Sequence, residues 1–292
     1  MNTKSQRRIA RTTTAPAHTP GFAGQGHFAA MVLTPADFAK SDPFLILADD
    51  KLDFTPGQQV GEPHPHAGLE TVTLLVEGGI TDHDAGTFNQ GDVEWMSAGR
   101  GVVHNENVIA HGKSRILQLW VVLPKGARDS RPALQAIHAD KIPVRRDAGV
   151  ELRLYSGTSA DLTSPTRNNV PVTMAEIRLE ANATVEQDLP ASYNAFLYML
   201  EGSVHGGDAE IRTGQTGWLD RPQGTEPGSL RITAGTTGAR LVLYAGLPQN
   251  EPVVAHGPFV ADSQESIARL FSDYRAGKFE HLSEVIRTAA AA

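Results

Sequence analysis

The sequence is organised around Pro63-His64-Pro65-His66 and Gly101-Val102-Val103-His104-Asn105-Glu106. In each stretch two metal-ligand side chains are two residues apart, the repeat at which an extended strand places side chains on one face. If the two strands are neighbours in a sheet, His64, His66, His104 and Glu106 converge on one point. A single His-x-His pair is often only a polar strand end, but two such pairs favour a divalent-metal site with three imidazoles and one carboxylate.

The stretches that flank these pairs favour strands. Short runs rich in β-branched or alternating apolar residues are separated by Gly, Pro and Asp, and the first hundred-odd residues show no helical pattern. This organisation predicts an all-β barrel or sandwich. The expected strands include 28–33, 43–48, 70–77, 91–96 and 115–123.

The chain contains a weak internal repeat. Residues 76–80 (Val-Glu-Gly-Gly-Ile) are echoed at 200–204 (Leu-Glu-Gly-Ser-Val), an offset of 124, and the Gly-x-x-x-Trp pattern of 91–95 is echoed at 214–218, an offset of 123. Two copies of one β-domain are therefore expected. At these offsets the four ligand positions fall on residues that form no ligand set, which favours chemistry rather than scaffolding for the histidines of the first copy. Those positions are Asp188, Pro190, Pro227 and Ser229.

These patterns predict four segments. Residues 1–26 are expected to be a flexible lead-in, 27–140 a β-domain with the metal site, 141–257 a β-domain without ligands, and 258–292 a C-terminal segment with a docking helix. In that segment Asp262-Ser263-Gln264-Glu265 indicates an N-cap with a capping-box glutamate, and Gly277 a C-terminal cap. The apolar stripe of the helix is Ile267, Leu270, Phe271 and Tyr274.

Composition limits the function classes. The 292 residues are 40% hydrophobic and 20% charged, with a formal charge of −7 from 26 basic and 33 acidic residues. Binding to a nucleic-acid backbone is disfavoured, because no long Lys/Arg block exists. The absence of cysteine excludes disulfides and thiolate sites. No apolar run is long enough for a membrane span or an export signal, so the expected location is the cytoplasm.

Several motifs together resemble the pirin family of the cupin superfamily. The match covers nearly the whole chain, and its most specific part is the Trp-Met-x-Ala-Gly-x-Gly-x-x-His-x-Glu string. The matching segments are Asp42–Leu45, Pro63–Thr73, Gly91–Glu106, Leu117–Val121 with Leu123-Pro124, and Gly257–Val260. The resemblance implies two cupin-type β-barrel (jelly-roll) domains in tandem followed by a C-terminal α-helix. It also implies the ligand set already selected by spacing, His64, His66, His104 and Glu106.

The resemblance further implies a function. Pirins are associated with an iron-type site and, in several members, with dioxygenase activity on the flavonol quercetin. Iron(II) is therefore the first choice of cofactor, although manganese, cobalt, nickel or copper also suit these nitrogen and oxygen ligands. Glu106 is expected to serve as the general base that takes the proton of a small aromatic substrate before dioxygen reacts. Asn105 and the altered hairpin at 82–86 depart from the family pattern and leave substrate preference open.

Two other readings remain open. The chain could be a metal-dependent binding module whose iron oxidation state a partner protein senses, since animal pirins are described as nuclear cofactors of transcription regulators. The sequence shows no partner motif for that role. Alternatively, the same metal could support a cupin reaction that consumes no oxygen, such as an isomerisation.

Other side chains near the ligands could also contribute to the site. Trp95 and Met96 could line a substrate pocket or belong to the core. His83 could reach the site as a donor to one of the ligands, but a solvated turn residue is the preferred interpretation. Phe54 and Trp120 are expected to be packing residues, together with Phe44.

Overall fold

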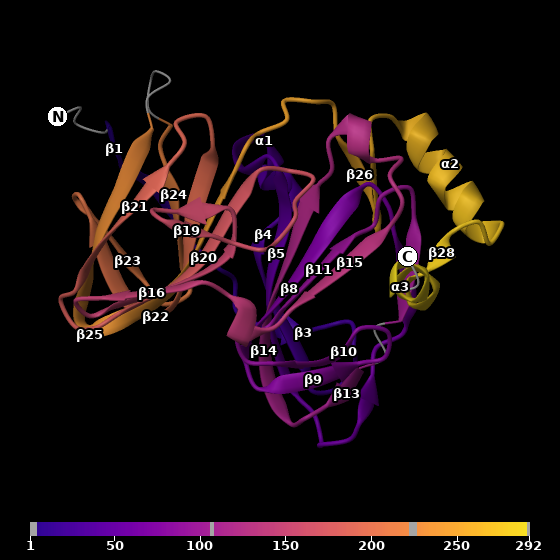
Figure 1. The fold of residues 1–292 in the computed structure, drawn as a ribbon, viewed down its shortest axis with the longest axis horizontal. Helices are drawn as coiled ribbons and strands as arrows, with labels where there is room; N and C mark the ends of the chain where they lie inside the picture. The colour runs from indigo at the N-terminus through magenta and orange to yellow at the C-terminus, as the bar shows by residue number, and fades with distance from the viewer. Residues whose placement is uncertain (1–4, 106–107, 222–226, 291–292) are drawn as a thin grey trace. The chain divides into compact units, whose positions relative to one another are not determined.

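The structure is a computed structural model that describes residues 5–105, 108–221 and 227–290. Its contacts divide the chain into two compact units. The first unit comprises Pro16–Ala39, Phe44–Asp140 and Gln249–Ala292, and the second unit comprises Met1–Ala15, Lys40–Pro43 and Lys141–Pro248. Both units consist mainly of β-strands, which confirms the all-β prediction (Figure 1).

The first unit holds a seven-stranded sheet, a four-stranded sheet, a three-stranded sheet and a strand pair. Its strands are β3 (Thr19–Pro20), β4 (His27–Leu33), β5 (Phe44–Asp53), β6 (Gln59–Val60), β7 (Pro63–His66), β8 (Leu69–Glu77), β9 (Gly79–Asp82), β10 (Gly86–Asn89), β11 (Val93–Ser97), β12 (Val102–Asn105), β13 (Val108–Ala110), β14 (Lys113–Val122), β15 (Ala133–Ile137), β26 (Val254–His256), β27 (Phe259–Ala261) and β28 (Glu280–His281). The seven-stranded sheet has the order β15-β11-β8-β14-β5-β4-β3.

A cavity lies inside the first unit, between its sheets. One wall is formed by β5, β8, β11 and β14 of the seven-stranded sheet, and the opposite wall by β6, β7, β9 and β13. Since alternate residues of a strand face opposite sides, each of these strands sends every second side chain toward the cavity. One end of the cavity is closed by a buried apolar cluster that includes Leu52, Phe54, Val60 and Ile80.

The second unit is built around a ten-stranded sheet with the main order β16-β17-β20-β25-β22-β24-β2. Its strands are β1 (Ser5–Arg7), β2 (Ile9–Thr14), β16 (Val144–Asp147), β17 (Val150–Ser156), β18 (Thr158–Ser159), β19 (Leu162–Thr163), β20 (Val172–Leu179), β21 (Thr184–Leu189), β22 (Asn194–Gly206), β23 (Ala209–Arg212), β24 (Gln215–Leu219) and β25 (Gly228–Gly246). A large cluster of buried, mainly aliphatic side chains lies in its interior.

Residues 5–14 form β1 and β2, although the sequence suggested a flexible lead-in over 1–26. β1 runs parallel to β25, and β2 is antiparallel to β24. The β-branched threonines at 12–14 favour an extended chain. Two contacts hold β2 in place, because Trp218 Nε1 donates to Thr13 Oγ1 at 2.9 Å and the Arg11 guanidinium lies 4.8 Å from the Trp218 ring centroid.

The internal repeat predicted from sequence is present in both units. Gly91 N donates to Leu75 O at 2.8 Å in the first unit, and Gly214 N donates to Met199 O at 2.9 Å in the second. Both glycines have a positive φ, +88° and +77°, which favours a residue without Cβ at this turn. The cross-strand partners of the repeated tryptophans also correspond, Val72 opposite Trp95 and Phe196 opposite Trp218.

The gapless alignment, however, placed the ligand-equivalent positions of the second unit on the wrong residues. β21 pairs with β25 as β7 pairs with β12, but Asp188 of β21 is exposed. The side chains of β21 and β25 that face the interior at this level are Gln187, Leu189 and Leu230. A shift of one residue reverses the face of a strand, so a small length difference between the copies accounts for the error.

The C-terminal segment belongs to the first unit, and its described residues form two helices rather than one. The α-helices in the described part of the chain are α1 (Phe38–Ser41), α2 (Gln264–Arg275) and α3 (Leu282–Ala290). α2 begins one residue later than the capping-box pattern indicated, because Ser263 is the N-cap and accepts from Ser266 N. Ile267, Leu270 and Phe271 of the predicted stripe pack against Phe259 and Phe279.

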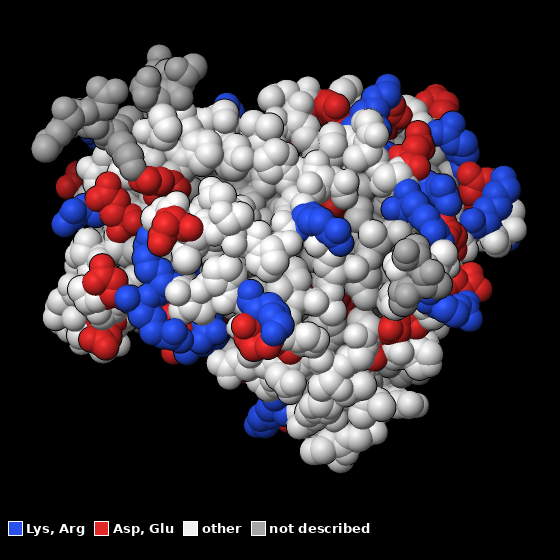
Figure 2. Space-filling view, in the orientation of Figure 1, with Lys and Arg blue, Asp and Glu red and all other residues white. Residues whose placement is uncertain are grey.

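Charged side chains of both signs are mixed on the surface. Figure 2 shows basic and acidic residues interspersed on the face that it presents. In the first unit, for example, Lys125 pairs with Asp262 at 3.0 Å and Lys278 with Asp273 at 2.6 Å. Among the described residues, no helix has the length and apolar character required to cross a membrane.

Candidate metal centre and cavity

The predicted histidines meet at one end of the cavity. β7 and β12 are antiparallel neighbours in which His64 lies directly opposite His104. The Nε2 atoms of these two residues are 2.9 Å apart, and the candidate ligand atoms of His64, His66 and His104 all lie within 4.8 Å of one another. Glu106, the fourth predicted ligand, lies outside the described residues.

The orientation of His64 is set by a backbone carbonyl. His64 Nδ1 lies 2.9 Å from Glu62 O, and a carbonyl can only accept, so Nδ1 carries the proton. In a neutral imidazole this leaves Nε2 with its lone pair directed toward the other two rings. Histidines that ligate metals commonly donate their second ring nitrogen to a carbonyl in this way.

Burial keeps the other two imidazoles neutral. His66 and His104 are each only 3% exposed. Burial, assisted by the neighbouring His64 ring and opposed by the Pro258 carbonyl, lowers the pKa of His66 from its usual 6.5 to about 3. Burial followed by the proximity of His66 and His64 lowers the pKa of His104 well below 6.5. Protons therefore compete poorly for these nitrogens at neutral pH.

The strand that carries His104 is held by contacts beyond its pairing with β7. Asn105 N at the end of β12 donates to Asp84 Oδ2 at 3.0 Å, and the C-terminal strand β28 pairs with β12 in parallel. Gly101 lies so close to the Phe279 ring that a Cβ would be 2.5 Å from a ring carbon. His83, read from sequence as a solvated turn residue, is exposed and contacts Asp84 at 3.1 Å.

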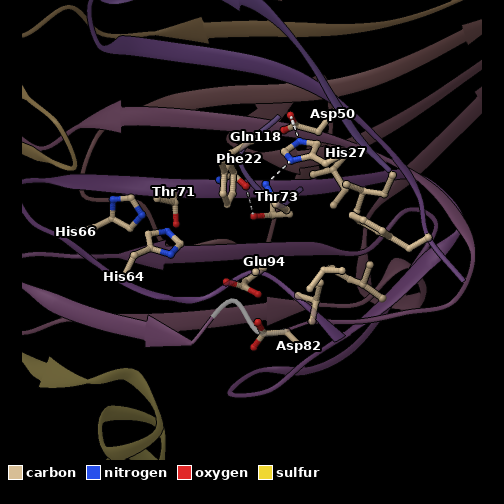
Figure 3. A pocket seen from close by; sticks show the side chains of 18 of the residues that line it. Phe22, His27, Asp50, His64, His66, Thr71, Thr73, Asp82, Glu94 and Gln118 are labelled. Atoms are coloured by element: carbon tan, nitrogen blue, oxygen red, sulfur yellow. Dashed lines mark hydrogen bonds and ion pairs between the residues drawn. The ribbon is translucent and has the colours of Figure 1, made fainter. Parts of the chain in front are cut away.

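The rest of the cavity is lined by residues that the sequence did not select. Trp120 contacts His66 edge-on with ring centroids 5.0 Å apart, and Phe54 belongs to the apolar end, although both were expected to be packing residues. Trp95 and Met96 are buried but are not among the lining residues. Figure 3 shows the polar lining side chains, which include Thr71, Thr73, Asp82, Glu94 and Gln118.

One signal for these residues was present in the sequence. Thr71 and Thr73 alternate with Val72 and Leu74, which indicates a strand with one polar face. That polar face is turned toward the cavity rather than toward solvent. Burial raises the pKa of Asp82 in the opposite wall. Hydrogen bonds that its carboxylate accepts from the backbone amides of Ala85 and Asp84 oppose this rise.

An aromatic side chain and a buried histidine border the cavity near His64. Ala23 N donates to His27 Nδ1 at 3.1 Å, so Nε2 carries the proton and donates to Asp50 Oδ1 at 3.0 Å. This arrangement fixes the loop that carries Phe22, whose ring centroid is 5.2 Å from that of His27 and 6.3 Å from that of His64. Phe22 is nevertheless 77% exposed.

The donor set fits a divalent transition metal. Three imidazoles converge, two of them held neutral by burial and one oriented by a carbonyl. This is the nitrogen-rich chemistry that iron, nickel, copper, zinc and related ions accept. His64, His66 and His104 could therefore hold one such ion.

Comparison with known proteins agrees with the fold and the motifs. The pirin family model matches residues 26–121, and the pirin C-terminal cupin domain model matches residues 174–280. Human pirin is 33% identical over 248 residues, which cover 81% of this chain and 82% of that protein. The chain belongs to the pirin family. The two matches together give it two cupin-type domains.

Two solved structures place this pirin among bicupins. A protein of Geobacillus kaustophilus is 40% identical with a TM-score of 0.76, covering 86% of this chain and 100% of that one. A quercetin 2,3-dioxygenase of Acinetobacter baumannii is 27% identical with a TM-score of 0.85, covering 94% of this chain and 99% of that enzyme.

Proposed function

We propose that this pirin is a metal-dependent dioxygenase that opens the ring of a flavonol such as quercetin. The observation that carries the proposal is the position of the histidine triad beside a cavity, because His64 and His66 line that cavity together with aromatic, aliphatic, hydroxyl-bearing and acidic side chains. Side chains of these kinds can contact the flat rings and the hydroxyl groups of a polyphenol. The structural similarity to an enzyme named quercetin 2,3-dioxygenase supports the same assignment.

His64, His66 and His104 would hold the ion, with Glu106 as the proposed fourth ligand. Iron(II) is the proposed metal. When bound, it would supply Lewis acidity toward the flavonol hydroxyl and bring substrate and dioxygen together.

The protein side chains have separate tasks in this proposal. Glu106 takes the proton of the flavonol hydroxyl, which makes the ring electron-rich enough to react with dioxygen. Trp120 and Phe22 confine the aromatic rings, and the apolar end formed by Leu52, Phe54 and Ile80 excludes water. Both atoms of dioxygen enter the ring-opened ester, and one ring carbon leaves as carbon monoxide.

Oxygen uptake tests the proposal. Protein reconstituted with iron(II) should consume oxygen when quercetin is added, with one carbon monoxide released per oxygen consumed. Glu106→Ala should lose uptake while its far-UV circular dichroism stays unchanged. If neither iron nor manganese, cobalt, nickel or copper supports uptake, the dioxygenase assignment is wrong.

A further inference from the structure

Three polar side chains lie next to one another across the seven-stranded sheet, and we call Gln118, Thr73 and Glu94 the polar rung. Gln118 of β14 and Glu94 of β11 are both cross-strand partners of Thr73 in β8. All three line the cavity, and Figure 3 shows Gln118 and Glu94 on either side of Thr73. The rung is therefore a feature of the cavity wall rather than of the surface.

The polar rung lies between the metal end and the apolar end. In one direction along β8 and β14, the next cavity-facing residues are Thr71 and Trp120, and the Trp120 ring contacts the His66 ring. In the other direction along β14, the next residue on the same face is Ile116, which belongs to the apolar cluster. Since same-face residues of a strand are about 7 Å apart, the rung lies roughly one aromatic ring away from the metal end.

The hydrogen-bonding capacity of the rung is directional. Thr73 Oγ1 donates to Gln118 Oε1 at 2.9 Å, so the acceptor of that amide is engaged and its Nε2 donors remain for a ligand. Glu94 is 9% exposed and offers carboxylate oxygens, which accept strongly from a hydroxyl group. A phenol hydroxyl can donate to Glu94 and accept from Gln118 at the same time.

We propose that the polar rung makes the cavity selective for aromatic ligands that carry a phenolic hydroxyl about one ring away from the metal-binding end. Glu94 accepts from this hydroxyl, and Gln118 donates to its oxygen. A ligand with a bare ring at this position makes neither of these hydrogen bonds, and sites that bind a ligand hydroxyl through polar side chains discriminate against analogues that lack it. This inference rests on the proposed flavonol-binding function and names its specificity-determining residues.

A comparison of two flavonols distinguishes the contribution of the polar rung to binding from that of the metal. Quercetin and 3-hydroxyflavone share the hydroxyl and carbonyl expected at the metal, but 3-hydroxyflavone has no other hydroxyl groups. Binding to the metal-loaded full chain is measured by calorimetry without oxygen, so that the readout does not depend on turnover. We expect quercetin to bind at least about 10-fold more tightly than 3-hydroxyflavone.

Variants of the rung test the cause of this preference. Glu94→Leu should reduce the ratio of the two dissociation constants to within about threefold by weakening quercetin alone, and Gln118→Leu should reduce it in the same direction. Glu77→Leu, on the same sheet but outside the cavity lining, should keep the wild-type ratio. A melting curve for each variant confirms that the comparison is made on folded protein.

The outcomes distinguish the two proposals. If the wild type binds both flavonols equally, or if Glu94→Leu and Gln118→Leu retain the preference, the polar rung does not select the ligand, whatever the oxygen uptake shows. If the preference is present and lost in these variants while no metal supports oxygen uptake, the rung assignment stands and the dioxygenase assignment is wrong.

Discussion

His64 and His104 face each other across the β7–β12 pair with their Nε2 atoms 2.9 Å apart. His64 Nε2 carries a lone pair, so this separation requires either a proton donated by His104 Nε2 or a cation shared by the two nitrogens. With His66 in the same group, a divalent ion satisfies all three rings at once. The strand pairing thus places the imidazoles where a divalent ion could bind.

The first prediction concerns the metal. His104→Ala removes one of the three imidazole donors and should lower metal affinity at least about 10-fold, because the loss of a ligand weakens metal binding. Far-UV circular dichroism should remain that of a β-protein. Metal content after dialysis, measured by plasma mass spectrometry, checks the first statement, with His83→Ala as an exposed histidine control. Unfolding of the variant would instead mean that His104 is needed for the fold.

The second prediction concerns pH. The folded pKa of His66 is about 3 and its usual value is 6.5, so between these values the unfolded chain binds a proton that the folded chain does not. His66 therefore contributes stability that is present above pH 6.5 and is lost as pH falls toward 3. In the metal-free protein, His66→Gln should reduce the pH slope of the unfolding free energy between pH 6 and 5 by up to roughly 1 kcal/mol per pH unit.

Urea unfolding at several pH values measures that slope. His83→Gln is the matched control, since His83 is exposed in its turn. An unchanged slope in His66→Gln would show that this imidazole titrates normally in the folded protein.

The ligand strands could be predicted from the sequence, because the pattern that indicates them lies within a few consecutive residues. The two-residue spacing in 63–66 and 101–106 requires only an extended chain, and β7 and β12 are extended neighbours. The repeat at offsets near 124 was also visible, because glycine turns such as Gly91 and Gly214 have a strict backbone requirement. Whether the chain holds a metal there stays a prediction.

The cavity could not be predicted because its lining depends on long-range pairing. Trp95 and Trp120 both lie in strands with alternating patterns, but only the fold decides that Trp120 faces His66 while Trp95 donates to buried Glu70. His27 gives no local signal, since its partner Asp50 lies on the neighbouring strand β5. The short helix α3 was missed because its apolar positions, which include Leu282 and Val285, span little more than two turns.

The third prediction concerns the exposed aromatic at the cavity. Phe22→Ala should weaken quercetin binding about two- to tenfold, because one aromatic contact contributes about 0.5–1.5 kcal/mol. The melting temperature should change little, since Phe22 is 77% exposed. Phe28→Ala is the control, because Phe28 is also exposed but does not line the cavity. Equal affinity for wild type and Phe22→Ala would remove Phe22 from the binding site.

The fourth prediction concerns the support that the C-terminal segment gives to the ligand strands. Phe279 is 8% exposed, packs against the Phe259 ring with centroids 5.6 Å apart, and lies against Gly101 at the start of the second ligand stretch. Phe279→Ala leaves a void there and should lower the unfolding free energy by about 3–5 kcal/mol. Metal affinity should fall with it, because β28, which follows Phe279 directly, pairs with the strand that carries His104.

Tyr274→Ala separates these two effects. Tyr274 contacts the same aromatic cluster but is 37% exposed, so its truncation should cost less stability than that of Phe279 and should leave metal affinity unchanged. Denaturant titration and competitive metal chelation measure the two quantities on each variant. If Phe279→Ala loses stability but binds metal as tightly as the wild type, the β7–β12 pair positions the histidines without help from the C-terminal segment.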